Sequence, residues 1–143
     1  MMDFGMEHSK IKRILVFSEK KQALQREQKE LFTPDMTDMC LIGRLYDIFK
    51  DVLSERNCPP NPQSVIQRKK FLFIILYLYS PETLAGGVMK RGLRKVLCDV
   101  LGLSSLTIIS DNISDLVFLS QRYSDWHADV MAIYSEMMAR ITP

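Results

Sequence analysis

The residues of this 143-residue chain that could do chemistry do not have the spacing of a catalytic or metal-binding motif. Cys40, Cys58 and Cys98 are odd in number and widely separated, which is typical of reduced thiols rather than of a disulfide framework. Together with His8 and His127 they form no CxxC, HxxxH or HExxH spacing that would hold a metal ion. We therefore expect no disulfide, no metal site and no cofactor.

Pairs of candidate nucleophile and base residues do not favour catalysis either. Asp125 lies near His127 and Cys98 is next to Asp99, but residues one or two positions apart point in different directions on a helix. Neither pair has a third group that would orient it. The methionines are distributed among Leu and Ile, which favours core filling over a cofactor site. The sequence thus predicts that the chain is not an enzyme.

Positive charge is concentrated in the middle of the chain, although the net charge of the whole chain is only +2. Residues 61–95 contain seven Lys and Arg residues but one acidic residue. The seven are Arg68, Lys69, Lys70, Lys90, Arg91, Arg94 and Lys95. A local basic stripe in a nearly neutral protein is what a phosphate-facing surface needs, so we expect these side chains to bind DNA phosphates.

The stretch LRKVLCDVLGLSSLTIISDNISDL, from Leu93 to Leu116, has the pattern of two helices joined at a corner. A helix-turn-helix needs a small residue in its first helix and a glycine at the corner. Cys98 and Gly102 satisfy these two requirements. The apolar residues that would lock both helices together are Leu97, Leu101, Leu103 and Ile108. The sequence therefore predicts a helix-turn-helix at about residues 89–123.

The second helix of this pair opens with short polar side chains that can reach phosphates or base edges. The groups expected to face the DNA groove are Ser104, Ser105, Thr107, Ser110 and Asn112. Acidic residues oppose strong binding, because Asp111 and Asp115 would repel phosphates and Arg122 is the one basic residue of this helix. We therefore expect most of the affinity to come from the basic helix before the corner, and the sequence preference to be modest.

Apolar residues recur at three- and four-residue steps along most of the chain, which predicts an all-α fold with five or six helices. The expected helices cover about residues 10–31, 41–53, 64–79, 89–101, 105–123 and 124–141. The nine-residue apolar run from Phe71 to Tyr79 could also be a buried strand, but no alternating partner strand occurs elsewhere. Pro81 begins at most a short turn. We expect an N-terminal helical segment, residues 1–60, and a helix-turn-helix domain, residues 61–143, packed as one compact unit.

Neither a membrane span nor an export signal is recognisable. The longest apolar run is far shorter than the roughly eighteen residues that a bilayer requires. The first residues, MMDFGMEHSKIKRILVF, have no apolar stretch of signal-peptide length and no small-residue cleavage site. We therefore expect a cytoplasmic protein without a membrane partner.

Three segments in the second half of the chain resemble the C-terminal DNA-binding domain of the bacterial replication initiator DnaA, and more loosely the Trp repressor. They are RKKFLFIILYLYS (68–80), LGLSSLTIISDNISDLVFLSQRY (101–123) and SDWHADVMAIYSEM (124–137), and the resemblance covers about residues 65–140. The initiator's recognition helix opens with Asp-His-Ser/Thr-Thr, for which only Ser105 and Thr107 can stand in here. The ATPase loop GxxxxGK(S/T) is absent. The resemblance thus implies a helix-turn-helix that binds DNA, but not origin recognition.

Together these features predict a small DNA-binding protein of bacterial, phage or mobile-element type, acting on double-stranded DNA as a transcription or replication accessory factor. A homodimer would suit this function, because paired half-sites multiply the few base contacts of one short helix. The alternative is a non-enzymatic structural or adaptor protein that forms helical homo-oligomers, such as a phage assembly component. Its interface anchors would then be aromatic residues such as Tyr77, Tyr79, Trp126 and Tyr134.

Overall fold

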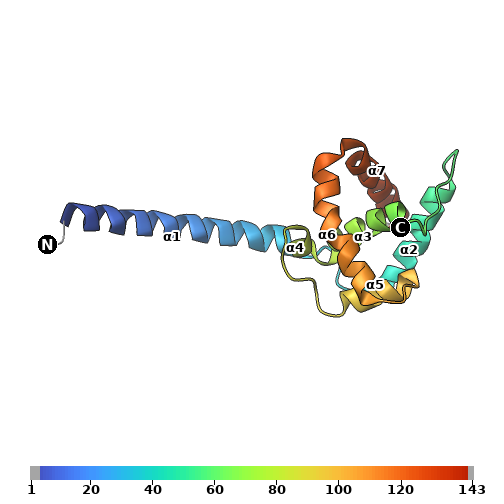
Figure 1. The fold of residues 1–143 in the computed structure, drawn as a ribbon, viewed down its shortest axis with the longest axis horizontal. Coiled ribbons are helices and arrows are strands. Elements are labelled where there is room, and N and C mark those ends of the chain that lie inside the picture. Colours follow the sequence, from blue (N-terminus) through green and yellow to red (C-terminus); the bar gives the residue numbers. More distant parts are fainter. Residues whose placement is uncertain (1–3, 142–143) are drawn as a thin grey trace. The chain divides into compact units, whose positions relative to one another are not determined.

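The structure is a computed structural model that describes residues 4–141, and within this range the regular secondary structure is all helical, with no β-strand (Figure 1). The all-α class predicted from the sequence is confirmed. The elements are α1 (Phe4–Phe32), the short 3-10 helix η1 (Met39–Leu41), α2 (Ile42–Ser54), α3 (Val65–Tyr79), α4 (Pro81–Leu84), α5 (Leu93–Leu101), α6 (Leu106–Arg122) and α7 (Ser124–Ile141). The count of seven α-helices in the described range exceeds the expected five or six because Pro81 begins a helical turn of its own, α4.

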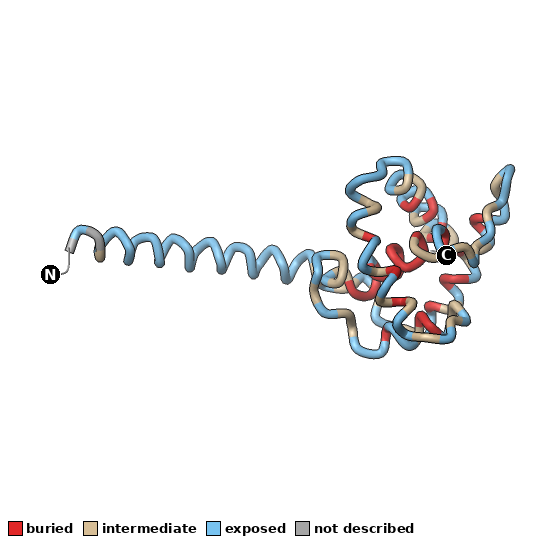
Figure 2. Tube along the Cα trace, in the orientation of Figure 1, coloured by how far each residue is buried: buried red, intermediate tan, exposed pale blue. Residues whose placement is uncertain are grey.

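The chain divides into two compact units, the first ending at Thr33 and the second beginning at Pro34. The first unit consists of α1, a helix of 29 residues whose side chains are almost all exposed (Figure 2). The expected boundary near residue 60 does not coincide with this division, because α2 contacts α3, α5 and α7 and so belongs to the second unit. Residues 34–60 are therefore part of the same core as the helices that follow them.

Helix α3 is the centre of the second unit, and it packs against α2, α4, α6 and α7. The apolar run that could have been a strand is thus helical, and its residues from Phe71 to Leu76 are all buried (Figure 2). Phe71 lies between two aromatic rings of α2, with centroid distances of 4.9 Å to Tyr46 and 5.2 Å to Phe49. A helix that is apolar on all sides must be surrounded by other elements, which explains the central position of α3.

Local signals define the ends of α3 and α5. Ser64 follows the proline-rich segment and its hydroxyl accepts a hydrogen bond from the Gln67 amide, which caps the amino end of α3. Helix α5 begins at Leu93, later than expected, because Gly92 adopts a left-handed conformation with φ of 85°. Gly102, with φ of 66°, ends α5 in the same way.

No single helix between residues 4 and 141 is both long enough and apolar enough to cross a bilayer. Helices α5 and α6 meet the length and hydropathy requirement only when they are taken together, and they are bent by 103° relative to each other.

Candidate nucleic-acid interface

The corner between α5 and α6 is a four-residue turn, residues 102–105, at which the two helices meet at 103°. The left-handed conformation of Gly102 turns the chain, and the Ser105 hydroxyl accepts a hydrogen bond from the Thr107 amide at 3.2 Å. Cys98 is buried, and its thiol donates to the Leu103 carbonyl at 3.1 Å. A small side chain in the first helix and a glycine at the turn therefore lie where the sequence predicted them.

The amino end of α6 is open to solvent. Ser104, Leu106 and Thr107 are exposed, and Ser105 and Ser110 are half-buried. The hydroxyls of Ser104 and Thr107 are thus accessible at this helix end, whereas the Ser105 hydroxyl is engaged in the cap. Backbone N–H groups at a helix amino terminus also favour negatively charged ligands.

Asn112 does not face solvent, which corrects its assignment to the groove-facing surface. Its side chain is buried, and its carbonyl oxygen accepts a hydrogen bond from Nε of Arg68 at 2.8 Å. The residues of α6 that point into the core are Ile109, Asn112 and Leu116, at steps of three and four. This spacing was visible in the sequence, but the polar type of Asn112 suggested an exposed position.

The consecutive cations of α3 are held by side chains of other helices rather than directed at solvent. Nζ of Lys69 lies 3.0 Å from Oδ2 of Asp115 in α6. Nζ of Lys70 lies 2.6 Å from Oδ2 of Asp129 in α7, and Lys70 is buried. The structure therefore corrects the expectation that these lysines form part of an exposed phosphate-binding stripe.

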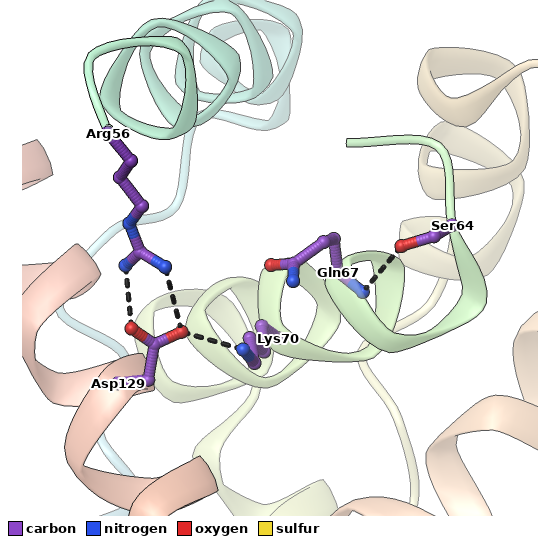
Figure 3. A network of polar contacts seen from close by, with 5 residues as sticks. All are labelled: Arg56, Ser64, Gln67, Lys70 and Asp129. Carbon is purple, nitrogen blue, oxygen red and sulfur yellow. Dashed lines mark hydrogen bonds and ion pairs between the residues drawn. The ribbon is translucent and has the colours of Figure 1, made fainter. Parts of the chain in front are cut away.

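Asp129 is the centre of a polar network that joins three parts of the second unit (Figure 3). Its carboxylate accepts hydrogen bonds from Lys70 and from both terminal nitrogens of Arg56, which follows α2, at 2.6 and 3.3 Å. Burial alone would raise the pKa of the Asp129 carboxyl, but the hydrogen bonds and positive charges of Arg56 and Lys70 lower the pKa below its usual value. Gln67 lies on the same side of α3, and its buried side-chain oxygen has no hydrogen-bond partner among the described residues.

Sequence reasoning did not identify this network. Arg56 and Asp129 are 73 residues apart, and no motif links them. Two features of the sequence could have indicated it: Arg56 is an isolated basic residue after α2, and Asp129 is the single acid within an otherwise apolar face of α7. Only packing of α2, α3 and α7 brings the two charges together.

The four cations at the start of α5 differ in their surroundings. Lys90 is half-buried: its amide donates to the Ser80 hydroxyl at 3.0 Å, and its ammonium donates to the Thr37 carbonyl at 3.2 Å. Arg91, Arg94 and Lys95 are exposed and have no ion pair with any of residues 4–141. The accessible positive charge of the α5–α6 pair thus comes from the start of α5 and the residue just before it, whereas at the turn itself the basic side chain is Arg68 of α3, which is half-buried and bonded to Asn112 through Nε.

The ion pair that makes Lys69 unavailable to DNA phosphates also neutralises Asp115, one of the two α6 carboxylates that would repel DNA. Asp115 is bound to Lys69, whereas Asp111 is exposed and has no ion pair within the described part of the chain. The α5–α6 pair therefore carries three accessible cations at the start of its first helix and two accessible hydroxyls at the start of its second. Each helix also has one exposed carboxylate without an ion pair among the described residues, Asp99 in α5 and Asp111 in α6.

No cluster of three or more Cys, His, Asp or Glu residues in the described range is arranged to hold a metal ion. Cys40 and Cys58 are exposed free thiols and Cys98 is a buried one. The hydrogen bond between Ser120 and Nδ1 of His127, at 2.7 Å, lies at the exposed α6–α7 corner. Comparison with known proteins gives no match to a protein-family model, to a curated protein sequence or to a solved structure.

Proposed function

We propose that this chain binds double-stranded DNA and that α5 and α6 act as a helix-turn-helix. The observation that carries the proposal is the group of exposed cations without an ion-pair partner, Arg91, Arg94 and Lys95, at the start of the helix that leads into the solvent-open amino end of α6. The 103° bend and the four-residue turn with Gly102 lie within the range of helix-turn-helix units.

Phosphate contacts supply most of the affinity of such a protein, and side chains at the start of the second helix contribute what sequence preference there is. Cations that have no protein partner can bind phosphates without first breaking an ion pair. Three phosphate contacts predict that log K falls with log salt concentration with a slope of about −2.7. Binding is therefore weak for one chain, and Ser104 and Thr107 allow modest base discrimination.

The test is the affinity of the full chain for a mixed-sequence duplex, measured by fluorescence anisotropy over a range of salt concentrations. Replacing Arg91, Arg94 and Lys95 together by Gln removes the three accessible cations, and the magnitude of the salt slope should fall by about 2.7. The matched control replaces Lys12, Lys20 and Lys21 of α1 by Gln, which removes the same charge elsewhere. Unchanged duplex affinity and salt slope in the first triple variant would show that the proposal is wrong.

A specific feature of α1 favours a second function, the formation of helical homo-oligomers. Phe17, Leu24 and Leu31 recur at seven-residue steps, and each is more than half exposed. Ile14 lies three residues before Phe17 and is 56% exposed. Helices of two or more chains pack into a coiled coil through two apolar positions per heptad. Phe17, Leu24 and Leu31 fill one of these positions, and the other holds Ile14, Lys21 and Gln28. We therefore propose a second copy of α1 as the partner of this row.

Sedimentation equilibrium tests this second function. The full chain should sediment as a dimer or larger oligomer, and Phe17→Lys combined with Leu24→Lys should make it monomeric, because each change places a charge within the apolar row. Gln22→Lys is the control, since residue 22 lies outside the row. A monomeric wild-type chain at micromolar concentration would exclude the oligomer.

A further inference from the structure

A cavity of about 330 Å³ lies beside the α5–α6 corner. Its lining comes from α2, the segment before α3, α3 itself and the corner, and consists of Tyr46, Pro62, Gln63, Arg68, Leu101, Gly102 and Leu103. The volume is near the lower end of the range for small-molecule sites, so it suits a small ligand. Because Gly102 and Leu103 belong to the turn, a ligand here would contact the corner directly.

Arg68 is the charged residue of this lining, and a hydrogen bond to a core residue fixes the orientation of its guanidinium. Its Nε donates to the Asn112 side chain at 2.8 Å, and Asn112 is buried in the core. The two terminal nitrogens of Arg68 have no hydrogen-bond partner among the described residues. A guanidinium held at Nε keeps a planar pair of donors, which is the geometry that binds phosphate and carboxylate groups.

The other polar groups of the lining suit an anion as well. Tyr46 is held by ring packing against Phe49 and Phe71, and its hydroxyl can donate a hydrogen bond. Gln63 adds a side-chain amide, and no carboxylate lines the cavity. Neighbouring Pro62, Leu101 and Leu103 are apolar, which leaves one charged and two polar groups to determine what binds.

We propose that this cavity binds a phosphate group, with Arg68 as the principal ligand and Tyr46 and Gln63 as further donors. The phosphate has two sources with the same chemistry: the backbone of bound DNA, or a free phosphorylated small molecule. The DNA source rests on the proposed function, whereas the free source does not. In both cases the phosphate sits against the turn that joins α5 to α6 and restrains it.

The test uses the full chain and inorganic phosphate as the probe, with thermal unfolding as the readout and sodium chloride at equal ionic strength as the reference. A ligand at about ten times its Kd increases the folded-to-unfolded ratio about tenfold, so phosphate should raise Tm more than chloride does. Gln63→Glu should abolish this difference, because it places a carboxylate in the lining without disturbing the Arg68–Asn112 hydrogen bond. Arg68→Gln should abolish it too. Arg44→Gln, an exposed residue of α2 outside the lining, should respond like the wild type.

Two results would overturn the proposal: equal Tm values in phosphate and chloride for the wild-type chain, or a phosphate effect that survives Gln63→Glu. Adding a DNA duplex distinguishes the two possible sources of the phosphate. If DNA supplies the phosphate, saturation with duplex removes the effect of inorganic phosphate, and Gln63→Glu weakens duplex binding. If the source is a free molecule, phosphate stabilises the chain equally with and without duplex. If phosphate raises Tm but the chain does not bind duplex, the phosphate site is supported and the proposed DNA function is wrong.

Discussion

Nζ of Lys70 lies 2.6 Å from Oδ2 of Asp129, and the same carboxylate binds Arg56 through both oxygens, at 2.6 Å through Oδ1 and at 3.3 Å through Oδ2. One buried lysine in a row of three basic residues is thus a structural cross-link between α3 and α7. Two cations share one carboxylate, so Asp129 holds together positive charges that would otherwise repel each other and be poorly solvated. We therefore expect the loss of Asp129 to lower the free energy of unfolding more than the loss of Lys70.

Asp129→Asn should therefore destabilise the protein by about 2–3 kcal/mol, because it leaves Lys70 buried without a counter-charge. The cost is below that of breaking a fully buried pair, since the Asp129 side chain is 26% exposed. Lys70→Met should cost about 1 kcal/mol or less, because a buried charge is replaced by an apolar chain of similar length and Asp129 keeps Arg56. Urea denaturation followed by circular dichroism measures both, and a larger loss for Lys70→Met would contradict this account.

The free energy of unfolding should fall at acid pH partly because of Asp129. The pKa of this carboxyl is lower in the folded chain than in the unfolded chain, since Arg56 and Lys70 outweigh the effect of burial. Its contribution is therefore complete above the unfolded pKa and is lost as pH falls below about 4 towards the folded pKa. Urea midpoints measured between pH 7 and pH 3 should fall more steeply for the wild type than for Asp129→Asn. Parallel pH profiles would refute this role.

Lys69→Gln should leave the salt slope of duplex binding unchanged, in contrast to the loss expected for the triple variant of Arg91, Arg94 and Lys95. Lys69 is bound to Asp115, so its charge is not available to a phosphate. The change frees the Asp115 carboxylate, and affinity at low salt should fall slightly through repulsion. Anisotropy titrations over the same salt range provide the comparison. A slope reduced by about one unit would mean that Lys69 contacts a phosphate.

Gly102→Ala should destabilise the protein by about 1–2 kcal/mol, because residue 102 has φ of 66° and an added Cβ disfavours this conformation. Gly43→Ala is the matched control. Gly43 lies in α2, and a Cβ added there meets no atom within 4 Å, so the change should stabilise by about 0.5 kcal/mol. If the left-handed turn is present, thermal unfolding should give a lower Tm for Gly102→Ala and a higher Tm for Gly43→Ala than for the wild type. Equal stability for both would mean that the corner is not built around Gly102.

The sequence by itself determined the helices and the corner, because the signals for both act over a few residues. Apolar residues three and four apart indicated α2, α6 and α7, and no strand pattern competed with them. Gly102 ends α5 and Ser105 caps α6 through contacts with immediate neighbours, so chain order was enough to place them. The inward position of Asn112 was not predicted, because its polar type suggested an exposed residue.

Tertiary structure alone decided which cations remain accessible. Lys69 and Asp115 are 46 residues apart, and Lys70 and Asp129 are 59 apart, so neither pair is visible as a motif. A run of basic residues looks the same in sequence whether it faces solvent or a carboxylate on another helix. Packing of the helices decides between these two cases. Helix α3 is surrounded by other helices, so a charge buried there needs a partner of opposite charge. The basic side chains at the start of α5 are exposed to solvent and need no such partner.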